Sequence, residues 1–253
     1  MTDLIVGVDC ATQTKRVGLA LARHSTSGCR VVEAKVCRDV TTPAEVIAEW
    51  IGDSAGVLLA LDAPLGWPAP LGDALSKHAA GLQITEPANI LFRRNTDRFV
   101  KRLTGKTPLD VGADRIARTA HSALFLLAEL RRRLGEPIPL VWATPLKERV
   151  AAIEVYPAAT LLAYGAILKG YKADARLAER QSIFRILEKR VDCSTLAAQV
   201  CASADTFDAV VCVLAAVDFL EGWAIPPDQP QLALKEGWIW VRRPNNDLGY
   251  KAE

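Results

Sequence analysis

Acidic residues recur in this sequence at places from which they could act together. Asp9 and Asp62 each end a short apolar run, and Glu154 lies near the end of another. Asp205 and Asp208 lie three residues apart at the start of a long apolar stretch, so a helix would place them on one face. Ligands of open α/β sheets bind at the carboxyl ends of strands. We therefore expect these acids to gather at one edge of a sheet.

Converging carboxylates repel one another unless a cation lies between them. Oxygen ligands favour Mg²⁺ or Mn²⁺ over zinc. Two such ions about 4 Å apart can activate a water and stabilise the leaving oxygen in phosphodiester cleavage. The chemistry expected is in-line attack by a metal-activated water, without a covalent enzyme intermediate. The predicted catalytic residues are Asp9, Asp62, Glu154 and Asp208, and the predicted metal ligands are these four with Asp205.

Each acid also has a simpler interpretation. An acid at the end of a strand is commonly a turn residue, and Asp205 is suited to be the N-cap of a helix over residues 205–223. The helix dipole could favour Asp208 in the first turn. The four predicted catalytic acids taken together are harder to explain in this way. Asp208 is followed by an apolar stretch, and a charge near a core is costly unless it is paired or bound to metal.

The densest basic stretch of the chain, residues 93–118, is a second candidate for function. Its cations could hold phosphates above the acidic centre; the alternative is a solvated helix face with ion pairs to Asp97 and Asp114. Trp67 could stack on a base or be a buried aromatic residue beneath this segment. The predicted substrate-binding residues are Arg93, Arg94, Arg98, Arg102, Arg115 and Trp67.

The elements that would position these residues follow from apolar periodicity. Runs at 4–9, 16–22 and 29–37 have short connections, which predicts antiparallel neighbours because a parallel crossover needs a dozen or more residues. The continuously apolar run at 56–62 predicts a central, parallel strand. The other predicted elements are strands at 150–155 and 236–241, and helices that begin at Thr42–Pro43 and Tyr156–Pro157 or span 114–134, 173–190 and 205–223.

This order predicts an α/β fold: a mixed sheet of three antiparallel strands followed by parallel strands, flanked by helices, as in the RNase H-like architecture. Five prolines interrupt the pattern between residues 63 and 113. We interpret residues 1–253 as a single domain with a helical cap inserted at about 63–113.

Composition excludes several classes of protein. Half of the residues are hydrophobic, and 31 Lys and Arg against 29 Asp and Glu give a net charge of +2. This composition argues against disorder and against a protein that coats DNA.

The six cysteines form no C-x-x-C pair and are expected to be free thiols. The N-terminus has no signal-peptide pattern, and the longest apolar run, 209–217, is too short to span a bilayer. We expect a soluble, cytoplasmic protein that does not enter membranes.

Five segments resemble, in order, the family of unknown function numbered 429, whose members are described as predicted RNase H-like nucleases. The most specific are D-x-P-L-G at 62–66 and E-V-Y-P at 154–157; the others are VGVDCATQTKRVGLALA, RRNTDRFVKRLTGKTPLDVGADRIARTA and ADTFDAVVCVLAA. The resemblance covers roughly residues 3–241. It implies an RNase H-like fold and a metal-dependent site whose acids would be Asp9, Asp62, Glu154 and Asp208.

Three functions remain open at this point. The first is a Mg²⁺- or Mn²⁺-dependent phosphodiesterase that acts on nucleic acid or a nucleotide-like substrate. The second is an ATP-dependent phosphotransferase of the actin and sugar-kinase type, in which the turn at Thr12–Thr14 would hold a phosphate. The third is a binding module without catalysis, in which the acids would hold only a structural ion or form ion pairs with Arg or Lys.

Overall fold

A six-stranded mixed sheet forms the centre of the computed structural model, which describes residues 2–38, 40–112 and 114–244. The strand order is β5-β4-β1-β2-β3-β6. The strands are β1 (Leu4–Asp9), β2 (Gly18–Ser25), β3 (Gly28–Val36), β4 (Val57–Asp62), β5 (Val150–Glu154) and β6 (Val191–Asp192).

The directions of the strands confirm the predicted fold. β1, β2 and β3 pair antiparallel, whereas β4 pairs parallel to β1 on one side and to β5 on the other. β4 is therefore a central strand that is buried along both faces, which explains its continuous apolar run. Three antiparallel strands followed by parallel ones, with helices on both faces, is the RNase H-like arrangement.

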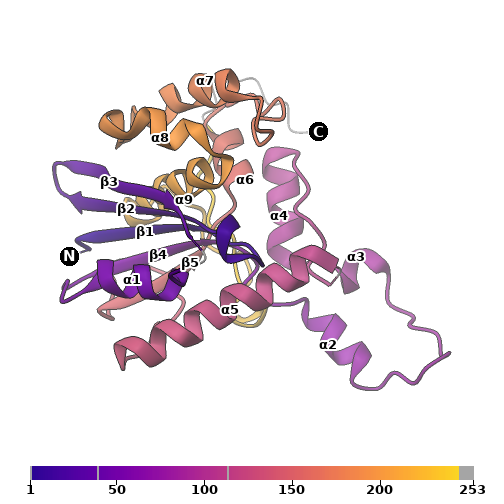
Figure 1. The fold of residues 1–253 in the computed structure, drawn as a ribbon. Helices are drawn as coiled ribbons and strands as arrows, with labels where there is room; N and C mark the ends of the chain where they lie inside the picture. Colours follow the sequence, from indigo (N-terminus) through magenta and orange to yellow (C-terminus); the bar gives the residue numbers. More distant parts are fainter. Residues whose placement is uncertain (1, 39, 113, 245–253) are drawn as a thin grey trace.

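Two layers of helices cover the sheet (Figure 1). On one face, α1 (Pro43–Ile51) and α5 (Asp114–Leu134) share a hydrophobic core with the strands. On the other face, α9 (Ala204–Leu220) packs on β1 and β2, and its core extends to α6 (Pro157–Ala163), α7 (Leu177–Leu187) and α8 (Ala197–Ala202). Alternate residues of β1 enter the two cores, as the period of two along a strand requires.

Local signals set the start of α1. The Thr42 side chain accepts a hydrogen bond from the Glu45 amide, and the Glu45 side chain accepts one from the Thr42 amide. This capping box satisfies two backbone donors that a helix otherwise leaves without partners. The helix then ends at Ile51, and Gly52 is its C-cap.

Three predicted elements differ from the structure. Ser203, not Asp205, caps α9, so Asp205 lies in the first helical turn. The helix predicted over 173–190 is the shorter α7, and the strand predicted over 236–241 is an isolated bridge between Ile239 and Glu154. It follows α10 (Pro230–Glu236), which lacks a clear apolar period and was not predicted.

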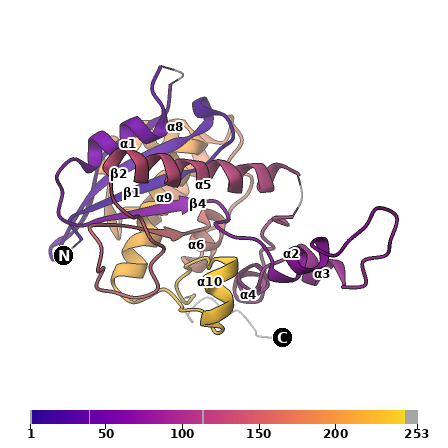
Figure 2. The same ribbon diagram turned by 90° about the horizontal axis from the view of Figure 1, so that it is seen from below.

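Residues 63–112 leave the sheet after β4 and carry three short helices, α2 (Ala69–Leu75), α3 (Ala88–Leu91) and α4 (Asn95–Thr104). Figure 2 shows α2 and α3 projecting beyond the sheet, while α4 lies near α10. Whether this segment acts as a cap remains a prediction. Across the described part of the chain, no helix combines the length and apolar character that a membrane crossing requires.

Candidate metal centre

Asp9 and Asp62 are brought together by the register of two parallel strands. β1 ends at Asp9 and β4 ends at Asp62, and the two residues are paired in that register. Neighbouring strands lie about 4.8 Å apart, and paired residues point to the same face. The two carboxylates therefore stand side by side at one edge of the sheet.

Asp208 reaches the same place from α9, because two glycines let this helix approach the sheet closely. A Cβ atom on Gly7 would lie 2.0 Å from the Ala209 carbonyl oxygen, and one on Gly18 would lie 1.9 Å from that of Asp205. No side chain larger than hydrogen fits at either position with the helix in place. The glycines of β1 and β2 thus set the distance from Asp208 to the strand ends.

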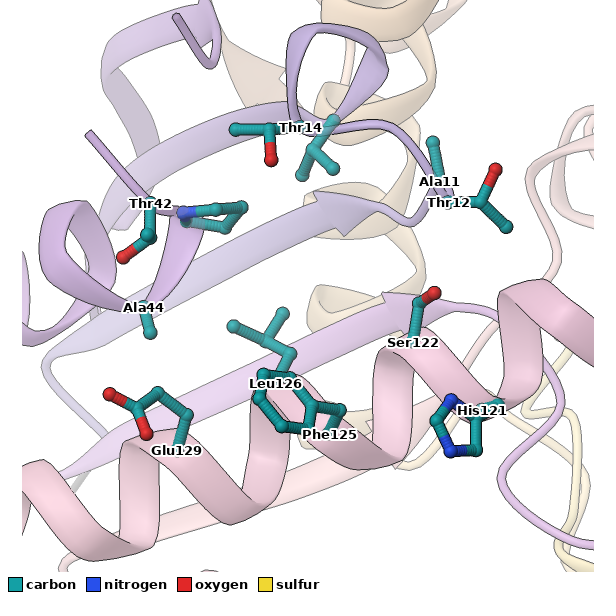
Figure 3. A pocket seen from close by; sticks show the side chains of 12 residues that line it. Ala11, Thr12, Thr14, Thr42, Ala44, His121, Ser122, Phe125, Leu126 and Glu129 are labelled. Carbon is teal, nitrogen blue, oxygen red and sulfur yellow. The ribbon is translucent and has the colours of Figure 1, made fainter. Parts of the chain in front are cut away.

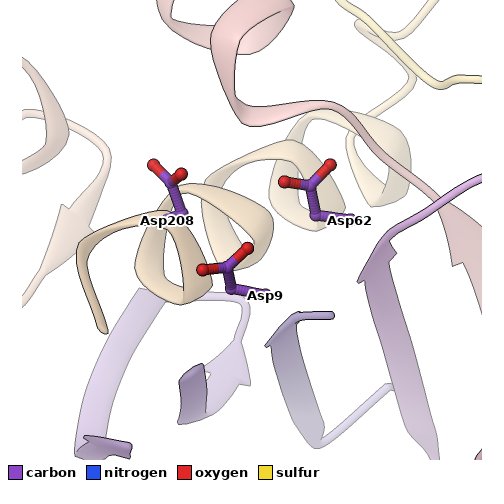
Figure 4. A group of neighbouring side chains, drawn as sticks. All are labelled: Asp9, Asp62 and Asp208. Atoms are coloured by element: carbon purple, nitrogen blue, oxygen red, sulfur yellow. The ribbon is translucent and has the colours of Figure 1, made fainter. Parts of the chain in front are cut away.

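The three aspartates form a compact cluster, with one carboxylate oxygen of each within 4.8 Å of the others. Figure 4 shows their carboxylates facing a common space. Burial raises the pKa of Asp62 to about 7, while Lys172 opposes the shift and the charges of Asp208 and Glu154 add to it. Burial and the charges of Asp208 and Asp62 also raise the pKa of Asp9 well above its usual value. The cluster therefore resists holding three negative charges without a cation.

One cation is already present beside the cluster. The Lys172 ammonium lies 2.5 Å from one oxygen of Asp208, and the Tyr171 hydroxyl donates to the other oxygen at 2.7 Å. Burial lowers the pKa of Lys172, but the charges of Asp208 and Asp62 outweigh burial and raise it, so the ammonium stays charged. Among the described residues, no side chain donates to, or forms an ion pair with, Asp9 or Asp62.

The loop that carries Tyr171 and Lys172 is held by a buried arginine of α7. Arg180 is 1% exposed, and its guanidinium donates to the carbonyls of Tyr171 and Ala173 at 2.7 and 2.8 Å. It also donates to the carbonyl of Cys201 in α8 at 2.7 Å. Arg180 thus positions the loop, and through it both groups that bind Asp208.

The donor set fits a hard divalent cation. Three carboxylates face one ammonium, so a net negative charge remains in a partly buried space. Oxygen donors alone favour Mg²⁺ or Mn²⁺ over softer metals. Asp9 and Asp62 have oxygens without protein partners in the described structure, and these are the atoms that an ion would meet first.

Glu154 lies beside this cluster but is engaged elsewhere. One of its oxygens accepts from Arg94 at 2.7 Å, and the other accepts from Arg94 and from the Leu65 amide, both at 2.9 Å. Asp97 binds the same guanidinium. The structure therefore brings Asp9, Asp62 and Asp208 together and places Glu154 in a separate buried ion pair.

All the side-chain hydrogen-bond donors of Arg94 have partners within the protein. Its five N–H groups bond to Asp97, Glu154 and the carbonyl of Glu236, and the residue is 1% exposed. Glu236 in turn accepts from the amides of Ala69 and Asn95. The arginine joins the 63–112 segment to β5 and α10, and it has no donor left for a phosphate.

The other predicted substrate-binding residues lie nearer the surface. Arg93 is paired with Asp110 at 2.7 Å, and Arg98 donates to the Arg93 carbonyl at 2.6 Å. Arg102 and Arg115 are exposed, and Trp67 is partly buried. Of the two anions expected to pair with this segment, Asp97 does so, while the side chain of Asp114 lies outside the described residues.

Asp205, the fifth predicted ligand, faces Arg16. The closest atoms of the two side chains are 3.3 Å apart, and Asp205 does not belong to the three-carboxylate cluster. Burial raises its pKa, and Arg16 opposes the shift. It contributes negative charge near Asp9 without sharing the common space.

A pocket of about 280 Å³ opens onto the cluster, with Asp9, Asp62 and Lys172 in its wall. Pro108 and Leu109, from the end of the 63–112 segment, and Ile116 and Thr119 of α5 line it as well. Leu109 is 68% exposed, so the rim is apolar on this side. The site thus sits between the sheet edge and the inserted segment.

Sequence reasoning missed Tyr171, Lys172 and Arg180. They belong to a loop and a helix far along the chain from the acids, and no spacing links them to Asp208. The one available signal was the isolated charge of Asp208 in an apolar helix, which requires a partner without indicating which residue provides it.

Comparison with known proteins gives one family and a distant structural match. No curated protein matches the chain. A structure of T. thermophilus RuvC in complex with Holliday junction substrate matches with 11% identity and a TM-score of 0.28, over 85% of this chain and 93% of that one. Because this TM-score is low, the match does not support the fold assignment, which rests on the order and the directions of the strands. The family model described as "Protein of unknown function (DUF429)" matches residues 7–232, and the chain belongs to that family.

Proposed function

We propose that the protein is a phosphodiesterase that depends on Mg²⁺ or Mn²⁺ and cleaves nucleic acid or a nucleotide-like substrate. The observation that carries this proposal is the cluster of Asp9, Asp62 and Asp208 within 4.8 Å of one another, with Asp9 and Asp62 in the wall of an open pocket. When bound, the metal supplies a water of lowered pKa and a positive charge for the leaving oxygen.

The residues of the chain hold and orient the parts of this reaction. Asp9 and Asp62 would hold the ion with their free oxygens, and Asp208 would join them in the orientation fixed by Tyr171. Lys172 uses one of its three donors on Asp208. The remaining donors, at the pocket wall, are placed to bind a phosphate oxygen of the substrate.

The 63–112 segment and α5 would complete the substrate site. Arg102 and Arg115 are exposed cations that can attract a phosphate backbone toward the pocket. Pro108 and Leu109 reduce the access of water to the cluster from this side. Arg94, Glu154 and Asp97 keep this segment against the sheet, which is a positioning role.

The two competing functions receive less support. The described residues contain one sheet with one β1–β2–β3 unit, whereas the actin and sugar-kinase architecture uses two such units. A silent binding module whose acids form ion pairs requires Arg or Lys on Asp9 and Asp62, and the ion pair of Lys172 is with Asp208 instead. A module that holds only a structural ion would bind metal without cleaving nucleic acid.

A thermal-shift experiment with Mn²⁺, Mg²⁺ and ATP on the wild type and on Asp9→Asn tests the proposal. We expect both metals to raise the Tm of the wild type, Asp9→Asn to lose the shift, and ATP alone to have no effect. The wild type should cleave single-stranded or duplex DNA or RNA in Mn²⁺, and Asp9→Asn should not. A wild type that shows neither a Mn²⁺ shift nor cleavage of any of these substrates refutes the proposal.

A further inference from the structure

A second cavity, of about 490 Å³, lies on the α1 and α5 side of the sheet. Figure 3 shows side chains from three elements around it: the loop after β1, the start of α1 and the middle of α5. Its volume is in the range of about 300–1,000 Å³ that is typical of ligand pockets. Nothing in the proposed reaction uses it so far.

The lining of this cavity suits an uncharged ring better than a phosphate. Ala11, Val17 and Leu126 give it an apolar surface, and hydroxyl groups of residues such as Thr12 and Ser122 supply hydrogen-bonding positions. Neither Lys nor Arg is among the described lining residues, whereas a carboxylate, Glu129, is. The Glu129 carboxylate is itself paired with Arg132 and Arg133, and His121 also lines the cavity. An anion would therefore find neither Lys nor Arg in the described wall, and this also argues against the phosphate role of the Thr12–Thr14 turn in a kinase.

Phe125 offers a surface on which a ring can stack. It is 66% exposed, and Figure 3 shows its ring in the middle of the cavity wall, between the end with Ser122 and the end with Glu129. Stacking of a base on an aromatic side chain stabilises single-stranded complexes without regard to sequence. The hydroxyls nearby can bond to the polar edges of such a ring.

The cavity adjoins the carboxylate pocket along two elements. Cys10 lines the carboxylate pocket, and the next residue, Ala11, lines the second cavity. On α5, Thr119 lines the first, and Ser122, one turn further, lines the second. Because two residues of extended chain span at most about 7 Å, Ala11 places the end of the cavity within one short step of Asp9.

We propose that this second cavity is a nucleobase subsite, which seats an unpaired base of the substrate while the adjoining phosphate reaches the carboxylate cluster. The inference rests on the proposed function and narrows its substrate to single-stranded nucleic acid or an extruded nucleotide. A base can enter such a cavity only when it is out of the duplex stack. Phe125 is the stacking platform, and Thr12 and Ser122 bind the edges of the base.

Binding of a labelled single-stranded DNA decamer by fluorescence anisotropy tests this subsite. The parent protein carries Asp9→Asn and Asp62→Asn, so that the decamer is not cleaved. The comparison ligands are the same decamer with a central abasic residue and the matched duplex. We expect the parent to bind the intact decamer more tightly than either of these.

Phe125→Ala in this parent should weaken binding of the intact decamer about 10-fold and remove its advantage over the abasic one. Ser122→Leu, which fills the cavity but keeps the phenyl ring, should do the same. The matched control is Leu234→Ala, which removes a side chain that is 59% exposed on α10 and should leave the affinity unchanged.

The outcomes separate this inference from the proposed function. If Phe125→Ala and Ser122→Leu both bind the intact decamer as the parent does, or if the parent prefers the duplex, the base subsite is wrong. The Mn²⁺ shift of the chain with native acids reports on the carboxylate cluster alone. The shift should survive Phe125→Ala, whereas cleavage should fall together with the affinity for the decamer. A wild type that shows neither the shift nor cleavage would refute the phosphodiesterase instead.

Discussion

Asp9 and Asp62 are register partners at the ends of two adjacent parallel strands, and in the described structure neither carboxylate has a hydrogen-bond or ion-pair partner in the protein. The pairing forces two like charges to the same edge of the sheet. In the absence of a cation, this arrangement costs folding free energy, which indicates that the acids serve a ligand rather than stability.

Neutralising one of these acids should stabilise the metal-free protein. For Asp62→Asn at pH 8 in a chelator, we expect a Tm about 2–4 °C above the wild type, the change that about 1 kcal/mol produces in a chain of this size. The same variant should show no Mn²⁺ shift. Asp53→Asn, which changes an exposed acid after α1, is the control and should alter neither quantity. A lower Tm for metal-free Asp62→Asn would contradict the view that its charge is unfavourable.

Metal binding should depend on pH in a defined direction. Because burial raises the pKa of Asp62 to about 7, the metal-free carboxyl holds a proton below that pH, and an ion must displace it. Burial also raises the pKa of Asp9, so an ion displaces protons from both carboxyls. We expect the Mn²⁺ affinity measured by calorimetry to rise by about tenfold or more per pH unit below pH 7. An affinity that stays constant between pH 5.5 and 8 would show that no proton is displaced.

The raised pKa of Asp62 also determines how the stability of the metal-free protein changes with pH. The folded pKa of Asp62 lies above the unfolded value of 3.8, so the folded state binds more protons between the two values. The contribution of Asp62 to stability is therefore full below about pH 4 and is lost as the pH rises to 7. Urea denaturation should show a steeper fall over this interval for the wild type than for Asp62→Asn.

Lys172 should act in opposite directions on metal affinity and on folding. Lys172→Met removes a positive charge next to Asp208, so Mn²⁺ should bind about 3–10-fold more tightly. The metal-free protein should lose about 1–2 kcal/mol, less than for a fully buried pair because the lysine side chain is 53% exposed. Lys169→Met, on the same loop and exposed, is the control. If Lys172 binds a substrate phosphate, cleavage falls although the metal binds better.

Gly7→Ala should disrupt the metal centre by displacing α9, the helix that carries Asp208. The added Cβ would lie 2.0 Å from the Ala209 carbonyl, so α9 must move and carry Asp208 with it. We expect a loss of about 1–3 kcal/mol, as for other overpacked cores, and a weaker Mn²⁺ shift in any folded protein. Gly72→Ala, in α2 with nothing within 4 Å of the new Cβ, is the matched control and should be neutral or slightly stabilising.

Arg94→Gln should affect folding rather than substrate affinity. It leaves Glu154 and Asp97 as buried acids without their cation, and breaking such a pair costs about 3–5 kcal/mol. Arg102→Ala removes an exposed cation and should leave the unfolding midpoint in urea unchanged while it weakens nucleic-acid binding. Equal stability of the two variants would show that Arg94 does not hold the fold together.

The sequence by itself determined five of the six strands and the three clustered acids. Runs with a period of two, short connections and a continuously apolar strand are local signals, and they predict β1 to β5 and the strand ends at Asp9 and Asp62. Asp208 was also visible from the sequence, because a charge inside an apolar helix requires a reason. The start of α1 was predictable from Thr42 and Pro43, because an N-cap and a first-turn proline are neighbours in the chain.

Only the tertiary structure decided how the remaining charges pair. Glu154 has the same local pattern as Asp9 and Asp62, yet Arg94, 60 residues away, engages both of its oxygens. Lys172 and Tyr171 bind Asp208 across 36 and 37 residues of chain, and Arg180 holds their loop. Hydrogen bonds and ion pairs form between any groups that folding brings within about 3 Å, whatever their separation in the chain. Local patterns therefore reveal which residues end a strand, whereas the contacts between distant segments decide which of their charges stay free for a ligand.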